Sequence, residues 1–199
     1  MRPHIWPSPK EIPAELQGRT ECGPRAIWAT LRFFGLDRSP DEIKAACGYV
    51  PEVFDGVYNR QHGTYLLGVA IAFRKFNLEV EWSGDDPEVF PEFLTATTLR
   101  AEAERLHLSH LSGMTTEELL ARLAGHRVAI VSHTYFDDGG AGHITPTSET
   151  KNGRVIFPLE TVDPTVEQLE VARKRKDQCR EVVLVWVADE SGEGNLQHC

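Results

Sequence analysis

The chain has 199 residues, 41% of them hydrophobic and 26% charged, a composition typical of one globular domain with a substantial core. Its formal net charge of −9 argues against nucleic acid and anionic membrane surfaces as partners, because both attract clustered lysine and arginine. No apolar run in the sequence approaches the roughly 18 residues that a transmembrane helix needs. We therefore expect neither a nucleic-acid nor a membrane partner.

The N-terminal residues 1–15 carry several prolines and no continuous apolar stretch, so they match neither a signal peptide nor a transit peptide. We expect an extended arm over 1–15, a single domain over 16–188 and a flexible tail over 189–199, in a cytoplasmic protein. The four cysteines form no C-x-x-C pair, which argues against a zinc knuckle. No metal or organic cofactor is expected.

Helices are predicted mainly in the first part of the chain. The segment CGPRAIWATLRFF (22–34) places apolar residues at helical spacing. The segment SPDEIKAAC (39–47) opens with Ser39 and, three residues later, Glu42, which together predict a capping box at a helix start. Further helices are predicted over residues 63–77, 97–108 and 115–125.

Strands are predicted mainly in the second part. LEVEW (78–82) alternates polar and apolar residues, and RVAIVSH (127–133) is apolar and β-branched. Three further strands are predicted over residues 143–148, 153–162 and 181–188. The basic run RKRK (173–176) is interpreted as a solvated helix face, with a docking patch as the alternative. Helices followed by strands indicate an α+β fold with an antiparallel sheet.

Cys22 stands at the predicted start of the first helix. Unpaired backbone N–H groups and the helix dipole stabilise an anion there, which favours a reactive thiolate. Gly23 would let a substrate approach the backbone closely. The alternative is a buried structural cysteine, and the adjacent Glu21 should oppose ionisation.

A cysteine nucleophile requires a base, and His143 is the preferred candidate. It follows the glycine-rich segment DDGGAG (137–142) and opens a predicted strand. His133, at the end of a buried strand, is the rival. The other histidines are interpreted as terminal, loop or surface residues: His4, His62, His107, His110, His126 and His198.

Asp163 is the candidate for holding the imidazole. An Asn-Gly turn predicts a hairpin between residues 143–148 and 153–162. A two-residue loop would place His143 opposite Val162, whereas a bulge or a longer loop would bring Asp163 beside it. Pro146 and Pro158 would nearly face each other in this hairpin. Because both cannot fit an ideal ladder, they favour such an irregularity. Alternatively, Asp163 only begins a turn.

Donors for an oxyanion are also required in amide-bond chemistry. The Cys22 backbone N–H is one candidate, and the side-chain amide of Gln17 is another. Several residues are expected to contact a substrate: Glu21, Gly23, Asp137, Asp138 and Gly142. The two aspartates suggest a cationic substrate group, with a solvated loop as the alternative.

Together these motifs resemble the papain-like cysteine peptidases, especially the small bacterial peptidases that process double-glycine leaders of bacteriocins. The matching segments are Gln17, ECGP (21–24), AGHI (141–144) and VDP (162–164). The resemblance implies Cys22 as nucleophile, His143 as base, Asp163 as orienting acid and Gln17 at the oxyanion. In the family, the glutamine usually stands six positions before the cysteine, and here it stands five before.

The sequence therefore predicts hydrolysis of a peptide or of an amide-containing small molecule through a thioester acyl-enzyme. An acyltransferase, peptide ligase or cyclase using the same cysteine is one alternative. A catalytically inactive peptide-binding module is another. A metal-dependent hydrolase using His133, His143 and the acids between them is a third.

Overall fold

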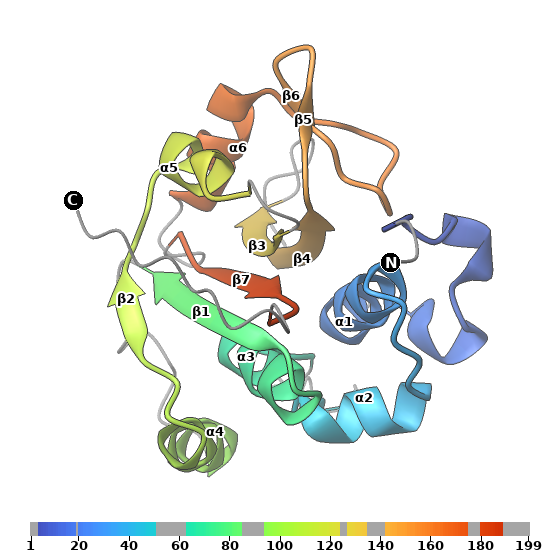
Figure 1. Ribbon diagram of the computed structural model, residues 1–199, viewed down its shortest axis with the longest axis vertical. Helices are drawn as coiled ribbons and strands as arrows, with labels where there is room; N and C mark the ends of the chain where they lie inside the picture. The colour runs from blue at the N-terminus through green and yellow to red at the C-terminus, as the bar shows by residue number, and fades with distance from the viewer. Residues whose placement is uncertain are drawn as a thin grey trace, which may run out of the picture.

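The computed structural model describes residues 4–18, 20–50, 63–84, 94–123, 127–134, 142–174 and 180–188. The helices are η1 (Pro9–Glu11), η2 (Ala14–Leu16), α1 (Cys22–Phe33), α2 (Pro40–Ala46), α3 (Leu66–Lys75), α4 (Leu94–Arg105), α5 (Thr116–Ala121) and α6 (Val166–Arg173). The strands are β1 (Glu79–Gly84), β2 (His110–Ser112), β3 (Val128–Thr134), β4 (Gly142–Thr147), β5 (Thr150–Lys151), β6 (Arg154–Val155) and β7 (Val182–Trp186). Figure 1 shows helices on both sides of a central sheet.

The central sheet has five strands in the order β2-β1-β7-β3-β4. All its pairs are antiparallel except β1 with β2, which is parallel. The α+β class is therefore confirmed, and the sheet is mixed instead of purely antiparallel. No strand is predicted at β2, because the three residues HLS are too few to show a strand pattern. Only the pairing with β1 defines this strand.

Apolar side chains cover both faces of the sheet. Val183 and Val185 pack in the core under α1, α2 and α3, whereas Val182 and Leu184 pack in a second core under α5 and α6. Successive strand residues point to opposite faces. A continuous apolar run such as that of β7 is therefore what a strand buried on both faces requires.

Several helices begin where the sequence predicts, because their first N–H groups are capped locally. Ser39 and Glu42 form the expected capping box of α2, and Thr115 caps α5 in the same way with Glu118. The start of α1 differs, since its N-cap residue Glu21 makes no side-chain bond to the helix. The backbone donors of the first turn of α1 thus have no side-chain cap.

The predicted hairpin forms, but it is much shorter than expected. Asn152 and Gly153 make the turn with positive φ, and β5 and β6 on either side have two residues each. The strand β4 pairs with β3 and not with residues 153–162. Since Pro158 lacks an N–H and cannot donate to a ladder, the chain after β6 leaves the sheet as a loop.

The N-terminal arm is folded onto the domain instead of extended. Trp6 stacks on Phe33 with ring centroids 4.5 Å apart, and its Nε1 donates to Ser148 Oγ at 3.0 Å. Leu16, in η2, is fully buried. The prolines of this segment are accommodated by 3₁₀ turns, the first capped by Ser8. The predicted tail, 189–199, lies outside the described residues.

Arg173 corrects the interpretation of the basic run as a solvated face, because its side chain is fully buried. Its guanidinium donates to Thr116 Oγ1 at 3.0 Å and to the carbonyl oxygens of Met114 and Arg180 at 3.3 and 3.0 Å. Arg173 therefore connects α6 to α5 and to Arg180, which precedes β7. The neighbouring Lys174 is exposed.

Arg173→Ala is expected to lower the free energy of unfolding by about 3–5 kcal/mol, because it leaves buried acceptors without their donor. Denaturant unfolding followed by circular dichroism measures the change. Lys174→Ala serves as the matched exposed control, with an expected change within about 0.5 kcal/mol. Equal stability of the two variants would contradict a structural role for Arg173.

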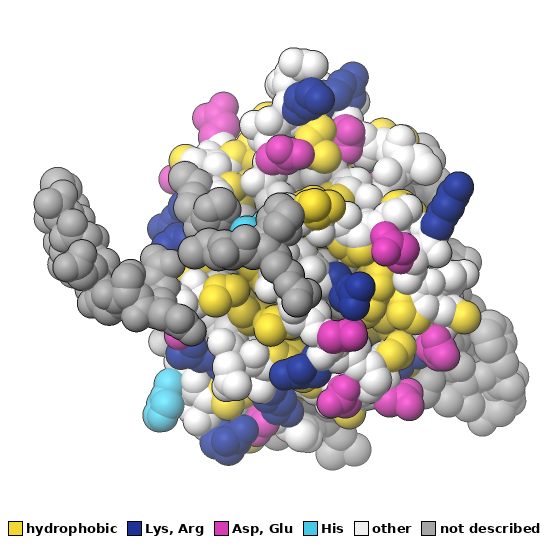
Figure 2. Space-filling model, turned by 45° about the vertical axis from the view of Figure 1, so that its right-hand side comes forward, with side chains coloured by type: hydrophobic (Ala, Val, Ile, Leu, Met, Phe, Trp, Pro, Cys, Tyr) yellow, Lys and Arg dark blue, Asp and Glu magenta, His cyan; other side chains and the backbone are white. Residues whose placement is uncertain are grey.

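On the face shown in Figure 2, acidic and basic side chains are interspersed among hydrophobic ones, with no continuous basic surface among the described residues there. No helix in the described ranges is both long and apolar enough to span a bilayer.

Candidate active site

Cys22 and His143 come from segments far apart in the sequence and meet where α1 packs against β4. Cys22 is the first residue of α1, and His143 is the second residue of β4. The Cys22 thiol is within hydrogen-bonding reach of the His143 side chain and of the backbone N–H of Ile144. The helix start and the strand start thus bring a sulfur and an imidazole together.

Glu160 is the acid that holds His143. The Nε2 atom of His143 lies 2.7 Å from Glu160 Oε1, so Nδ1 is the ring nitrogen left for the thiol. His143 is 3% exposed, whereas the side chain of Glu160 is 28% exposed. A chain of hydrogen bonds therefore runs from the sulfur through the imidazole to a carboxylate at the edge of the site.

The predicted placement of Asp163 at His143 is corrected by this arrangement. Asp163 Oδ1 accepts the backbone N–H of Phe157 at 2.9 Å, and its carbonyl oxygen accepts from Arg154 at 2.6 Å. These bonds close the loop 156–163, and Glu160 lies within that loop. Asp163 therefore shapes the segment that presents Glu160 and does not itself contact the imidazole.

The reason for this difference is the strand partner of His143. The sequence argument paired β4 with residues 153–162, but His143 lies opposite His133 of β3. Once that segment is a loop, the alternation of faces along a strand no longer restricts which acid reaches the imidazole. Glu160 carried no signal except that it is an acid near Asp163 in the sequence.

The charged forms of Cys22 and His143 stabilise one another. Burial would raise the pKa of the Cys22 thiol, but the hydrogen bond and charge of His143 outweigh it and hold the pKa below its usual value. Burial would likewise lower the pKa of His143, but its bonds to Cys22 and Glu160 raise the pKa to about 9. Both shifts act in the direction of a thiolate beside an imidazolium.

Glu160 and Arg25 complete the electrostatics. Burial would raise the pKa of Glu160, but the hydrogen bond and charge of His143 lower it overall, with Arg25 contributing a further positive charge. Arg25 lies one turn after Cys22 on α1 and also favours the thiolate. The orienting acid is therefore ionised at neutral pH.

His133, the rival base, lies beside the site and not at the sulfur. Its ring stacks on Phe157 at 5.3 Å and meets the His143 ring edge-on at 5.4 Å. It is almost fully buried. Its position behind His143 makes it a packing neighbour of the imidazole.

Glu21 and Gly23 have structural contacts that differ from the predicted contact with substrate. Glu21 Oε1 accepts from the Tyr49 hydroxyl at 2.6 Å and lies 3.6 Å from Lys44 Nζ. Gly23 is buried, and a Cβ at this position would lie 2.7 Å from the Thr64 side chain. The absence of a side chain at Gly23 therefore permits the close approach of Thr64, and Glu21 anchors the start of α1.

Two further predicted residues can be placed. The side chain of Gln17 donates to the Ile12 carbonyl oxygen at 2.8 Å, which uses one of its two N–H groups. Gly142 is exposed at the start of β4. Asp137 and Asp138, which are also the acids that the metal alternative requires, lie outside the described residues. In the ranges that the structure covers, no three His, Cys, Asp or Glu side chains gather as for a metal ion.

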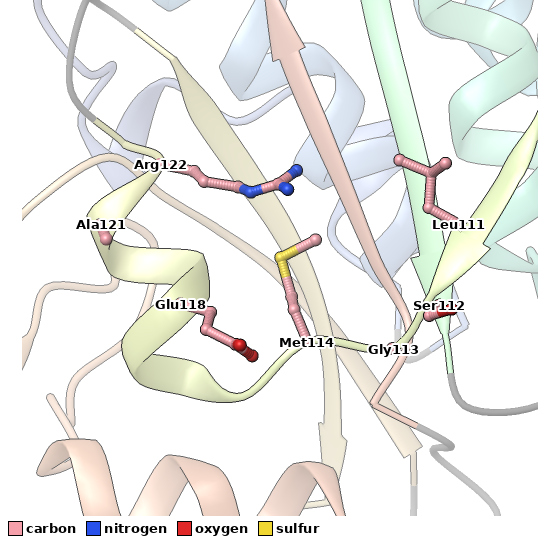
Figure 3. A pocket seen from close by; sticks show the side chains of 7 residues that line it. All are labelled: Leu111, Ser112, Gly113, Met114, Glu118, Ala121 and Arg122. Atoms are coloured by element: carbon pink, nitrogen blue, oxygen red, sulfur yellow. The ribbon is translucent and has the colours of Figure 1, made fainter. Parts of the chain in front are cut away.

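A pocket of about 390 Å³ lies elsewhere in the molecule. Figure 3 shows its lining, formed by residues 111–114 with Glu118, Ala121 and Arg122. It opens beside β2, at one edge of the sheet, whereas His143 lies on β4 at the other edge. This pocket is therefore separate from the Cys22 site.

The fold is similar to that of a solved protease domain. A double-glycine-motif protease from an AMS/PCAT transporter, solved in complex with the leader peptide, has a TM-score of 0.54 and 13% sequence identity, over 93% of this chain and 94% of that chain. The peptidase domain of Streptococcus ComA, a bi-functional ABC transporter involved in quorum sensing, has a TM-score of 0.48 and 14% identity, over 86% of this chain and 94% of that chain. No protein-family model and no curated protein matches the sequence.

Proposed function

We propose that this protein is a cysteine peptidase that cleaves a peptide bond through a thioester acyl-enzyme on Cys22. The observation that carries the proposal is the hydrogen-bonded chain from Cys22 through His143 to Glu160 at a helix start without a side-chain cap. Such a relay of nucleophile, base and orienting acid is what nucleophilic catalysis requires. The similarity in fold to a protease that binds a leader peptide favours a peptide substrate.

Each group has a defined task in the proposed reaction. The Cys22 thiolate attacks the carbonyl carbon, and the carbonyl oxygen becomes an oxyanion. When the tetrahedral intermediate collapses, the C–N bond breaks and imidazolium His143 gives its proton to the leaving amine. Water then attacks the thioester, His143 takes a proton from that water, and the carboxylic acid leaves as Cys22 regains its thiolate. Glu160 holds the imidazole throughout.

The oxyanion would be bound at the start of α1. The backbone N–H groups of Cys22 and Gly23 belong to the first turn, which no side chain caps. The amide of Gln17 retains one N–H beyond its bond to Ile12, and we propose it as an additional donor. Because these donors are fixed before the reaction begins, they would stabilise the developing charge without reorganisation.

Iodoacetamide labelling at a series of pH values, with peptide mapping by mass spectrometry, tests the activated thiolate. Cys22 is expected to label faster than an ordinary thiol at every pH below the usual thiol pKa, because its own pKa is lowered. Cys47 is the internal control, since burial raises the pKa of its thiol to about 11. In His143→Ala, the labelling profile of Cys22 should move up to the range of an ordinary thiol. Equal, slow labelling of Cys22 and Cys47 would contradict the proposal.

Cleavage should depend on pH differently from labelling. The His143 pKa is raised to about 9, so the imidazolium that protonates the leaving amine is present below that pH and lost above it. Peptide cleavage is therefore expected to fall as pH rises through about 9, while labelling does not fall. The product mass distinguishes hydrolysis, which adds water to the acyl fragment, from transfer to another amine.

A further inference from the structure

Glu181 is a buried carboxyl group that the proposed reaction does not use. It directly precedes β7, and its carbonyl oxygen accepts the Ser132 N–H of β3 at 3.2 Å. Since Val131 pairs with Val182, Glu181 lies opposite Ser132. Ser132 in turn pairs with Ile144 of β4. The three residues Glu181, Ser132 and Ile144 therefore form one row across the end of the sheet.

This row faces the same side of the sheet as the nucleophile. On a strand, side chains two residues apart point to the same face. Ile130 lies two residues from Ser132, and Val183 lies two residues from Glu181. Both belong to the core under α1–α3, as does Ile144 itself. Cys22 packs against that core, and its thiol meets the Ile144 N–H. Adjacent strands are about 4.8 Å apart, so the backbone of Glu181 lies about 10 Å from that of Ile144.

The carboxyl of Glu181 is buried, and no cation in the described part of the chain compensates for this burial. Burial raises its pKa to about 7, and a hydrogen bond from the Trp82 indole opposes the rise. Among the residues that the structure describes, no lysine, arginine or histidine pairs with this carboxyl. Trp82 offers one donor, whereas a carboxylate can accept several hydrogen bonds. The residue Glu181 as a whole, backbone included, has intermediate exposure.

The chain folds so that this end also carries the start of α3. The residues after α3 turn sharply at Asn77, which has a φ of 61°, and α3 packs against β1. The residues just before α3 also lie beside the start of α1, because a Cβ on Gly23 would lie 2.7 Å from the Thr64 side chain. Ser83 of β1 pairs with Val182 of β7. The next residue of β1, Gly84, therefore lies beside Glu181. The starts of α1 and α3 and the row from Ile144 to Glu181 thus share one end of the domain.

We propose that Glu181 forms the acidic end of a substrate subsite that receives a lysine or arginine side chain close to the scissile bond. The inference rests on the proposed function, because it places the subsite beside the peptide attached to Cys22. The methylenes of the basic side chain would lie along the row from Ile144 past Ser132, and its charged head would bond to the carboxylate. A buried carboxylate gains most from such a pairing, since it has lost its water.

Binding of short capped peptides to Cys22→Ala tests the subsite without requiring catalysis. The probes are acetylated, amidated alanine peptides that carry either lysine or norleucine at one position, assayed by calorimetry. At the best position, lysine is expected to bind about tenfold or more tightly than norleucine. In Cys22→Ala/Glu181→Gln the two peptides should bind equally. Cys22→Ala/Glu117→Gln, changed at an exposed acid of α5, should keep the preference.

Equal binding of the lysine and norleucine peptides to Cys22→Ala at every position would overturn the subsite, as would a lysine preference that survives Glu181→Gln. If Glu181→Gln fails to fold, Glu181→Asp takes its place, with a weakened preference expected. The proposed function fails separately, if the unchanged protein binds the lysine peptide but neither cleaves it nor labels rapidly at Cys22.

Discussion

Replacing Cys22 with alanine is expected to reduce peptide cleavage by about 10⁴-fold or more, to the background of the assay. The thiolate forms the only covalent bond between protein and substrate in the proposed reaction. Cys22→Ser should be nearly as inactive, because a hydroxyl does not ionise beside His143 as a thiol does. Release of amine from a peptide substrate, measured by mass spectrometry, gives the rate.

Cys47→Ala is the matched control for this change. Cys47 is buried after α2, and its sulfur lies 3.6 Å from Thr64 Oγ1. Its replacement should cost some stability through lost packing but leave the rate per folded molecule unchanged. Full activity of Cys22→Ala would show that Cys22 is a structural cysteine and would end the proposed mechanism.

Glu160→Gln is expected to lower kcat/KM by about 10²–10⁴-fold, because it removes the carboxylate that orients His143 and stabilises its charged form. The His143 pKa, raised to about 9 in the unchanged protein, should fall. The decline of cleavage at alkaline pH should therefore begin at a lower pH. A pH series of kcat/KM, with labelling of Cys22 over the same range, measures both effects.

Asp163→Asn tests whether Asp163, the acid predicted from the sequence, orients His143 in place of Glu160. Asparagine retains the Oδ1 that accepts the Phe157 N–H, so the loop 156–163 should stay closed and activity should change less than tenfold. Asp163→Ala removes that acceptor and should loosen the loop, with an intermediate loss. A large loss in Asp163→Asn together with full activity in Glu160→Gln would return the orienting role to Asp163.

Several features of the site could be read from neighbouring residues alone. The first turn of α1 begins at Cys22 because an apolar helical repeat follows it. His143 opens a strand because β-forming residues follow a glycine-rich segment. The starts of α2 and α5 follow from capping boxes, in which three residues determine a helix end. Each of these patterns acts over a few residues.

The partner of His143, the folded N-terminal arm and the buried Arg173 could not be predicted in this way. His143 had two possible strand partners, and the pairing of β4 with β3 decided between them. Arg173 looks like any charged residue of an exposed helix until α5 and the chain before β7 close over it. Its burial depends on contacts between segments distant in the chain, which no local pattern records.

The sequence by itself determined where Cys22 and His143 lie in their own elements, because helix starts and strand starts are set by local hydrogen bonding and hydrophobic period. Only the tertiary structure decided which acid meets His143 and that Glu181 shares the face of Cys22. Both depend on strand register and loop closure, where a change of one residue exchanges the two faces of a strand.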